Sequence, residues 1–122
     1  MNAGSAAEAP VIVEWERAVG EILDRTAQFP KVVRFTFSQR IDGLALDVLQ
    51  NLVEARYARG TSKEQALTRV SQGLVQLRVL LRLSHQRRFL DHRSYEALSR
   101  QLEGTGRKVG GWIRQQRRRG RL

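Results

Sequence analysis

The sequence predicts an all-α protein, an up-down-up-down bundle of four helices, and three observations support this fold class. Apolar residues recur at steps of three and four along four segments, as they do on one face of a helix. No segment alternates polar and apolar residues over the length of a strand, and no hairpin dipeptide occurs. Only two prolines interrupt the 122 residues, a length that fits one domain with one core.

The first helix is expected from Val11, because apolar residues follow at helical spacing from that point. Residues 1–10 are small and polar, and they are predicted to be a disordered N-terminal segment. The helix should end before Pro30, since the residue preceding a proline avoids the α region. The inward face of this helix comprises Val11, Trp15, Val19, Ile22, Thr26 and Phe29.

The second helix should begin near Lys31 or Val32 and stop at Gly60, because glycine is favoured just past a helix end. The third should open with the capping box Ser62-Lys63-Glu64-Gln65, in which side chains satisfy free amides of the first turn. Their inward faces comprise Phe37, Ile41, Leu44, Val48, Leu52 and Ala55 in the second helix and Leu67, Val70, Leu74, Leu77, Leu81 and Ser84 in the third.

The fourth helix is expected after a short loop, with Asp91 as its N-cap and Ser94 as the competing choice. It runs into the basic sequence RQQRRRGRL at the end of the chain. Residues 11–118 therefore form the predicted bundle domain, residues 119–122 form the end of a basic tail, and the short connections favour antiparallel neighbours. The inward face comprises Tyr95, Leu98, Leu102, Val109, Trp112 and Ile113.

The second and third helices each carry an additional apolar stripe beside the inward one. A helix in a monomeric bundle needs only one apolar face, so a second face favours burial against another subunit. A thick core within one bundle is the alternative. The additional stripes comprise Leu46, Leu49, Val53 and Tyr57 in the second helix and Val75, Val79 and Leu83 in the third.

Positive charge is concentrated in the second half of the chain. Residues 1–60 hold 7 Lys and Arg against 8 Asp and Glu, whereas residues 61–122 hold 15 against 4, which gives net charges of −1 and +11. An excess confined to one half is typical of a surface that binds polyanions. Nineteen of the 22 basic residues are Arg, whose guanidinium group binds phosphate in a bidentate manner, although an Arg-rich genome would also favour Arg over Lys.

Arg78 and Arg82 are the only charges in the apolar run from Gly73 to Leu83. They share a narrow arc of the helix with His85. Charges with apolar residues on both sides favour binding to a phosphate group or to an acidic protein partner. The alternative is that these side chains form a polar face in contact with water. The candidate binding residues in this part of the chain are Arg78, Arg82, His85, Arg87 and Arg88.

The last part of the chain, residues 107–121, carries seven cations and no acid. The helix dipole favours some cations at a C-terminus, but seven exceed that need, and such a segment attracts phosphate without reading sequence. Trp112 lies among them and is predicted to belong to the core rather than to stack on a base. The candidate binding residues here are Arg107, Lys108, Arg114, Arg117, Arg118, Arg119 and Arg121.

Several classes of function are not expected. The chain has no Cys, and its two His lie in a basic stretch with few carboxylates, so we expect no metal site, no cofactor and no catalytic set. No carboxylates are spaced as an acid/base pair. No apolar run reaches the roughly 18 residues of a membrane span, and no secretory signal is visible. These features predict a cytoplasmic protein that is not an enzyme, has no small-molecule substrate and does not contact a membrane.

The segments VEWERAVGEILDRTAQFPK, GLVQLRVLLRL and VGGWIRQQRR, in this order, resemble a known family. The chain is similar to Avd proteins, the accessory variability determinants of diversity-generating retroelements, over residues 11–118. The most specific parts of the resemblance are Gly73–Leu83 and Gly110–Ile113.

The resemblance implies a four-helix bundle that assembles into a homopentameric barrel. It also implies an accessory protein that binds RNA, DNA and the reverse transcriptase of the retroelement and supports mutagenic cDNA synthesis from a template RNA. Arg78 and Arg82 match the paired Arg of the family's third helix, so the resemblance implies a binding role for both.

Two alternatives remain open. One is a four-helix bundle protein of the kind encoded in ribosomal RNA intervening sequences, and the other is an oligomeric scaffold without a nucleic-acid role. Salt-dependent binding of nucleic acid would distinguish a binding protein from a scaffold. A reverse-transcriptase gene beside this one would favour the retroelement.

Overall fold

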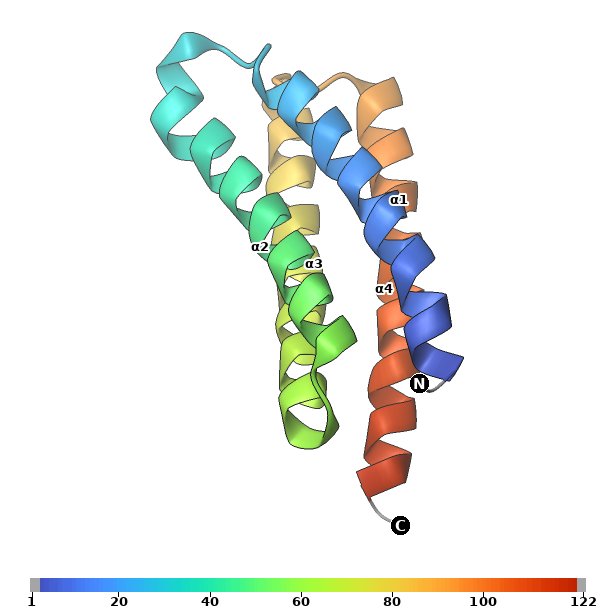
Figure 1. Ribbon diagram of the computed structural model, residues 1–122. Coiled ribbons are helices and arrows are strands. Elements are labelled where there is room, and N and C mark those ends of the chain that lie inside the picture. The colour runs from blue at the N-terminus through green and yellow to red at the C-terminus, as the bar shows by residue number, and fades with distance from the viewer. Residues whose placement is uncertain (1–2, 121–122) are drawn as a thin grey trace.

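Four α-helices pack side by side in a computed structural model that describes residues 3–120 (Figure 1). They are α1 (Ala3–Thr26), α2 (Gln39–Tyr57), α3 (Gly60–Gln86) and α4 (His92–Gly120). Consecutive helices run in opposite directions, so the two ends of the chain lie at the same end of the bundle. No strand occurs within the described range, and the all-α prediction is confirmed.

The first helix begins earlier than predicted. Residues 3–10 belong to α1, so the helix does not start at Val11 as predicted, while Met1 and Asn2 lie outside the described residues. The segment AGSAAEA is rich in Ala, the best helix former. Glu8 is buried and accepts a hydrogen bond from Lys63 Nζ at 2.9 Å through Oε2. This interaction holds the first turns of α1 against α3.

The connection from α1 to α2 is more elaborate than the single helix start predicted near Lys31. A 3₁₀ turn, η1 (Lys31–Val33), is followed by a wide π-helical turn, η2 (Arg34–Ser38), before α2 becomes regular at Gln39. Ser38 Oγ donates a hydrogen bond to the Thr26 carbonyl at 3.4 Å. The irregular turns therefore bring the chain back onto the end of α1.

Contrary to the prediction, Gly60 does not directly follow the end of α2. Helix α2 ends at Tyr57, and Gly60 is the first residue of α3, with φ of +59°. A left-handed conformation is accessible to glycine without a steric cost, so Gly60 lets the chain reverse within two residues. The helix has begun before Ser62, so the predicted capping box does not open it, and no side chain caps its N-terminus.

The core matches the predicted inward faces closely. Every predicted inward residue of α1 and α3 is buried, as is Phe29 beyond the end of α1. Four residues of the other two faces, Phe37, Leu44, Tyr95 and Trp112, are half-buried against the core. Trp15 donates its indole N–H to the Ala45 carbonyl at 3.0 Å, which fixes α1 on α2.

The helices form a square in which α2 and α4 lie on a diagonal. The main contacts are α1 with α2, α2 with α3, α3 with α4, and α1 with α4. Gly73 lets α2 and α3 approach closely, because a Cβ atom there would lie 2.7 Å from Val48 Cγ2. The outer sides of α2 and α4 consequently face opposite directions.

Candidate functional site

Arg78 and Arg82 are exposed on α3, beside the side of the helix that faces α4. The Arg78 guanidinium lies across the backbone of α4, since a Cβ atom at Gly106 would be 3.4 Å from Arg78 Nη2. Within residues 3–120, neither Arg has a carboxylate within ion-pair distance. Val75 and Val79 beside them are 57% and 46% exposed. The structure therefore presents two uncompensated cations next to apolar surface, as the sequence predicts.

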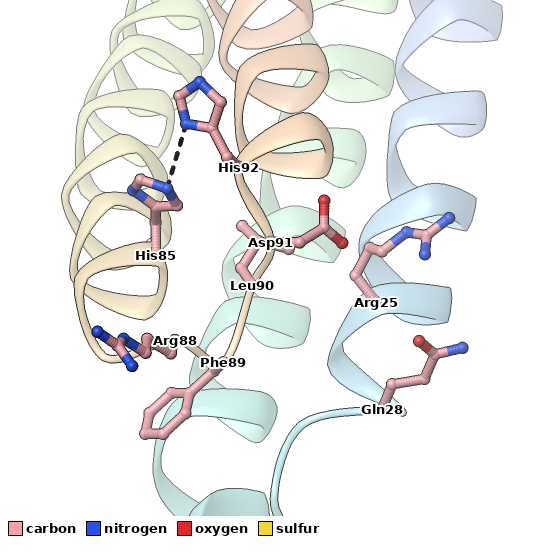
Figure 2. Close-up of a pocket in the computed structure, with 8 residues that line it drawn as sticks. All are labelled: Arg25, Gln28, His85, Arg88, Phe89, Leu90, Asp91 and His92. Carbon is pink, nitrogen blue, oxygen red and sulfur yellow. Dashed lines mark hydrogen bonds between the residues drawn. The ribbon is translucent and has the colours of Figure 1, made fainter.

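His85 takes part in a local cluster that joins α3 to α4 (Figure 2). Its ring stacks on Tyr95 with centroids 4.5 Å apart and planes 7° apart. His85 Nε2 lies 3.3 Å from His92 Nδ1, and His92 Nε2 lies 3.0 Å from Glu96 Oε1. His85 on α3 thus contacts two residues of α4, and its role in binding stays a prediction.

The α3–α4 loop places Arg87 and Arg88 at the end of the bundle. Arg88 has φ of +65°, and the chain turns there with Phe89 N–H donating to the Ser84 carbonyl at 2.9 Å. The position is one that glycine usually occupies at a helix C-terminus. Arg88 is exposed, so its charge stays available to a partner although its backbone is strained.

Asp91 caps α4, as predicted. Its Oδ1 accepts a hydrogen bond from the Ser94 backbone N–H at 2.8 Å, and its Oδ2 accepts one from Ser94 Oγ at 3.0 Å. The backbone hydrogen bond from Ser94 is the main cause that lowers the pKa of the Asp91 carboxyl, with a smaller contribution from the charge of Arg25.

A shallow cavity of about 450 Å³ lies beside this loop and includes Arg25, Gln28, Arg88 and the two His. Figure 2 shows the Arg25 and Arg88 side chains extending to opposite sides of the loop. The two guanidinium groups do not converge on one point. No group of three or more His, Asp or Glu side chains within residues 3–120 could hold a metal ion.

The C-terminal cations divide into paired and unpaired groups. Arg107 pairs with Glu103 at 3.2 Å, Lys108 with Glu14 on α1 at 2.9 Å, and Arg117 with Glu64 on α3 at 2.9 Å. The described chain supplies no carboxylate within ion-pair distance of the exposed residues Arg114, Arg118 and Arg119. Arg121 lies outside the described residues. Trp112 is packed against the core, as predicted.

Two exposed cations of α4, Arg93 and Arg100, belong to the same basic face and are not among the predicted site residues. They precede Arg107 and Arg114 at intervals of seven residues. Seven residues correspond to almost two helical turns, so the four side chains lie on one side of α4. The seven-residue interval is visible in the sequence and is the signal that identifies them.

The additional apolar stripes lie largely on the surface. Leu46, Val53 and Tyr57 of α2 are 43%, 41% and 77% exposed, and Leu83 of α3 is 39% exposed. A groove of about 590 Å³ runs between α2 and α3 and includes Val75 and Val79. A thick core within one bundle therefore does not explain these side chains, although it does explain Leu49, which is half-buried against the core. Further apolar exposure occurs before α2, at Val32 and Phe35.

Comparison with known proteins identifies one family. A family model described as bAvd-like matches residues 12–116, which is most of the chain. No curated protein matches the chain. No helix within the part of the chain that the structure describes is both long and apolar enough to cross a membrane.

Proposed function

Because the chain belongs to the bAvd-like family, we propose that it is an oligomeric accessory protein that binds nucleic acid and the reverse transcriptase of a diversity-generating retroelement. In this role it supports mutagenic cDNA synthesis from a template RNA. The family match confirms the resemblance to Avd proteins that the sequence predicts. The role in the retroelement is a property of the family that we propose for this chain as well.

The observation that carries the nucleic-acid part is the distribution of unpaired charge. The cations of α3 and α4 outnumber the carboxylates that could neutralise them, and Arg78, Arg82 and Arg114 are exposed without an acidic partner in the described range. Like charges held close together on a folded surface repel one another, and the negative charge of a bound polyanion relieves that repulsion. Binding also releases the counterions condensed on the polyanion, which favours the complex. A phosphate backbone is the ligand that suits this surface best.

The apolar surface supports self-association. Val75, Val79 and Leu83 line one side of α3, while Leu46 and Val53 lie exposed on α2. Removing such surface from water stabilises an interface by roughly 25 cal/mol per Å². We propose that copies of this chain cover these faces in a homo-oligomer, a pentamer by analogy with the family, and that the basic faces remain accessible.

The test of this proposal is binding measured at several salt concentrations. The full chain is titrated into labelled RNA, DNA and hybrid duplex, and into a reverse transcriptase of a diversity-generating retroelement. We expect all three nucleic acids to bind, with affinity that falls steeply as salt rises. Oligomers that bind neither nucleic acid nor the enzyme would instead favour a scaffold, the role that the exposed apolar surface would also suit.

A further inference from the structure

The outer face of α4 carries a row of four arginines, Arg93, Arg100, Arg107 and Arg114, which we call the arginine row. All four are exposed. A seven-residue step advances about 10 Å along a helix and rotates only about 20°. The row therefore extends about 31 Å along the helix and turns by about 60° around it.

Contacts on both sides of α4 show that the row points away from the bundle. Lys108 and Gln101 bind Glu14 and Glu21 of α1 on one side. Arg117 binds Glu64 of α3 on the other side. The positions of the row lie outside these two surfaces and outside the buried face, and all four side chains are exposed. The buried face comprises Leu98, Leu102, Thr105, Val109 and Ile113.

The arginine row lies opposite the part of the apolar surface that α2 carries. Leu46, Val53 and Tyr57 belong to α2, the helix on the diagonal from α4 (Figure 1). An oligomer that buries the groove between α2 and α3 against a surface other than α4 leaves the outer face of α4 uncovered. The row then remains available for a ligand on the outside of the assembly.

Only one neutralising ion pair forms along the row within residues 3–120. Arg107 pairs with Glu103, and both side chains are more than half exposed, so the pair contributes little and is easily exchanged. In the same range, the other three arginines of the row have no carboxylate at ion-pair distance.

We propose that the arginine row is a docking surface for the phosphate backbone of a nucleic-acid duplex that lies lengthwise along α4; this inference rests on the proposed function. The row matches about nine base pairs at 3.4 Å each. Single strands are usually held by aromatic side chains on which bases stack. The two aromatic residues of α4, Tyr95 and Trp112, are half-buried, and His85 covers the Tyr95 ring. The row therefore offers charge without a stacking platform, which suits a duplex.

The experiment compares two variants in which the same number of charges is removed. R93Q/R100Q/R107Q/R114Q neutralises the row, and R25Q/K31Q/R34Q/R59Q neutralises four exposed cations near the ends of the bundle, outside the row and outside the groove between α2 and α3. Binding to a DNA duplex of about 20 base pairs and to a single strand of equal length is measured over a range of salt. The wild-type chain, circular dichroism and light scattering serve as references for folding and assembly.

We expect the row variant to bind the duplex about tenfold or more weakly than the control variant at moderate salt. Its log–log salt slope should be shallower by roughly 0.9 for each phosphate that is no longer neutralised. R93K/R100K/R107K/R114K keeps the charge and should bind nearly as the wild type does, which also separates an effect of charge from an effect on the fold.

Three results would overturn the inference. The first is a row variant that binds duplex as tightly as the control variant, and the second is a Lys variant that is folded and no longer binds. The third is a row variant in which only the affinity for single strands falls. If the wild-type chain shows no salt-dependent binding at all, the proposed function fails as well, whereas each of the first three results leaves that function standing.

Discussion

Lys63 on α3 and Glu8 on α1 form an ion pair that is almost completely buried, with the two residues 5% and 3% exposed. The pair joins residues 55 positions apart in the chain. Two buried charges that satisfy each other add little net stability, but removing one of them leaves the other without compensation. The pair therefore fixes where the first turns of α1 lie.

Replacing Glu8 by Gln should destabilise the protein, because the Lys63 ammonium would stay buried without its counter-charge. We expect a decrease of up to about 3 kcal/mol in the free energy of unfolding, since unwinding of residues 3–10 would let Lys63 reach water and limit the effect. Urea denaturation measures this change in the free energy of unfolding. Glu16→Gln, at an exposed position of the same helix, should change stability by less than about 0.5 kcal/mol.

Gly73→Ala should destabilise the bundle despite the higher helix propensity of Ala. The new Cβ would lie 2.7 Å from Val48 Cγ2, and such overpacking costs about 1–3 kcal/mol. Gly20→Ala, where nothing lies within 4 Å of the new atom, should stabilise by up to about 1 kcal/mol. Thermal unfolding of both variants and of Val48→Ala/Gly73→Ala tests the explanation, because the double variant should recover part of the stability. Equal behaviour of the two glycine variants would contradict it.

Arg88→Gly should stabilise the α3–α4 loop. A residue with a Cβ atom at φ of +65° is less stable than glycine in the left-handed region by about 1 kcal/mol. The same change at Arg87, whose φ is −83°, should give no such gain. Chemical denaturation of the two single variants distinguishes them, and an Arg88→Gly protein that is less stable than wild type would contradict the strain argument.

Self-association should depend on the exposed side of α3. Light scattering of the wild type should give a mass several times 14.0 kDa, five times if the family's assembly applies. Val75→Asp/Val79→Asp should dissociate the assembly, because the two carboxylates would be desolvated in the interface. Val13→Asp, at a position on α1 that is 48% exposed, is the matched control. A wild-type monomer at micromolar concentration would rule out the oligomer.

Replacing Arg78 and Arg82 by Ala should leave the fold intact, because both side chains are exposed and Ala is a good helix former. Binding of nucleic acid or of the reverse transcriptase should weaken by about 2–5 kcal/mol if the complex desolvates both charges. Lys at both positions should restore only part of the affinity, since an ammonium group cannot bind phosphate in a bidentate manner. If the double Ala variant binds both nucleic acid and the reverse transcriptase as tightly as the wild type does, the two Arg belong to a solvated face without a binding role.

Much of the candidate surface could be found from residue type and spacing. Arg78 and Arg82 stand out because they interrupt an apolar run, and the structure places both on the surface. Arg107, Lys108 and Arg117 show the limit of that reasoning, because each of them has a carboxylate as its ion-pair partner in the folded chain. Two of those three partners come from other helices, so no local pattern around the cations reveals them.

By itself, the sequence determined the fold class and the buried face of each helix, because burial along a helix follows from the local period of its apolar residues. The inward residues from Val11 to Phe29 and from Leu67 to Ser84 are buried as that period predicts. Only the tertiary structure decided that residues 3–10 are helical and that Gly60 begins α3 rather than following α2. These outcomes depend on interactions such as that of Glu8 with Lys63, which arise only when distant segments pack together and which short-range periodicity does not encode.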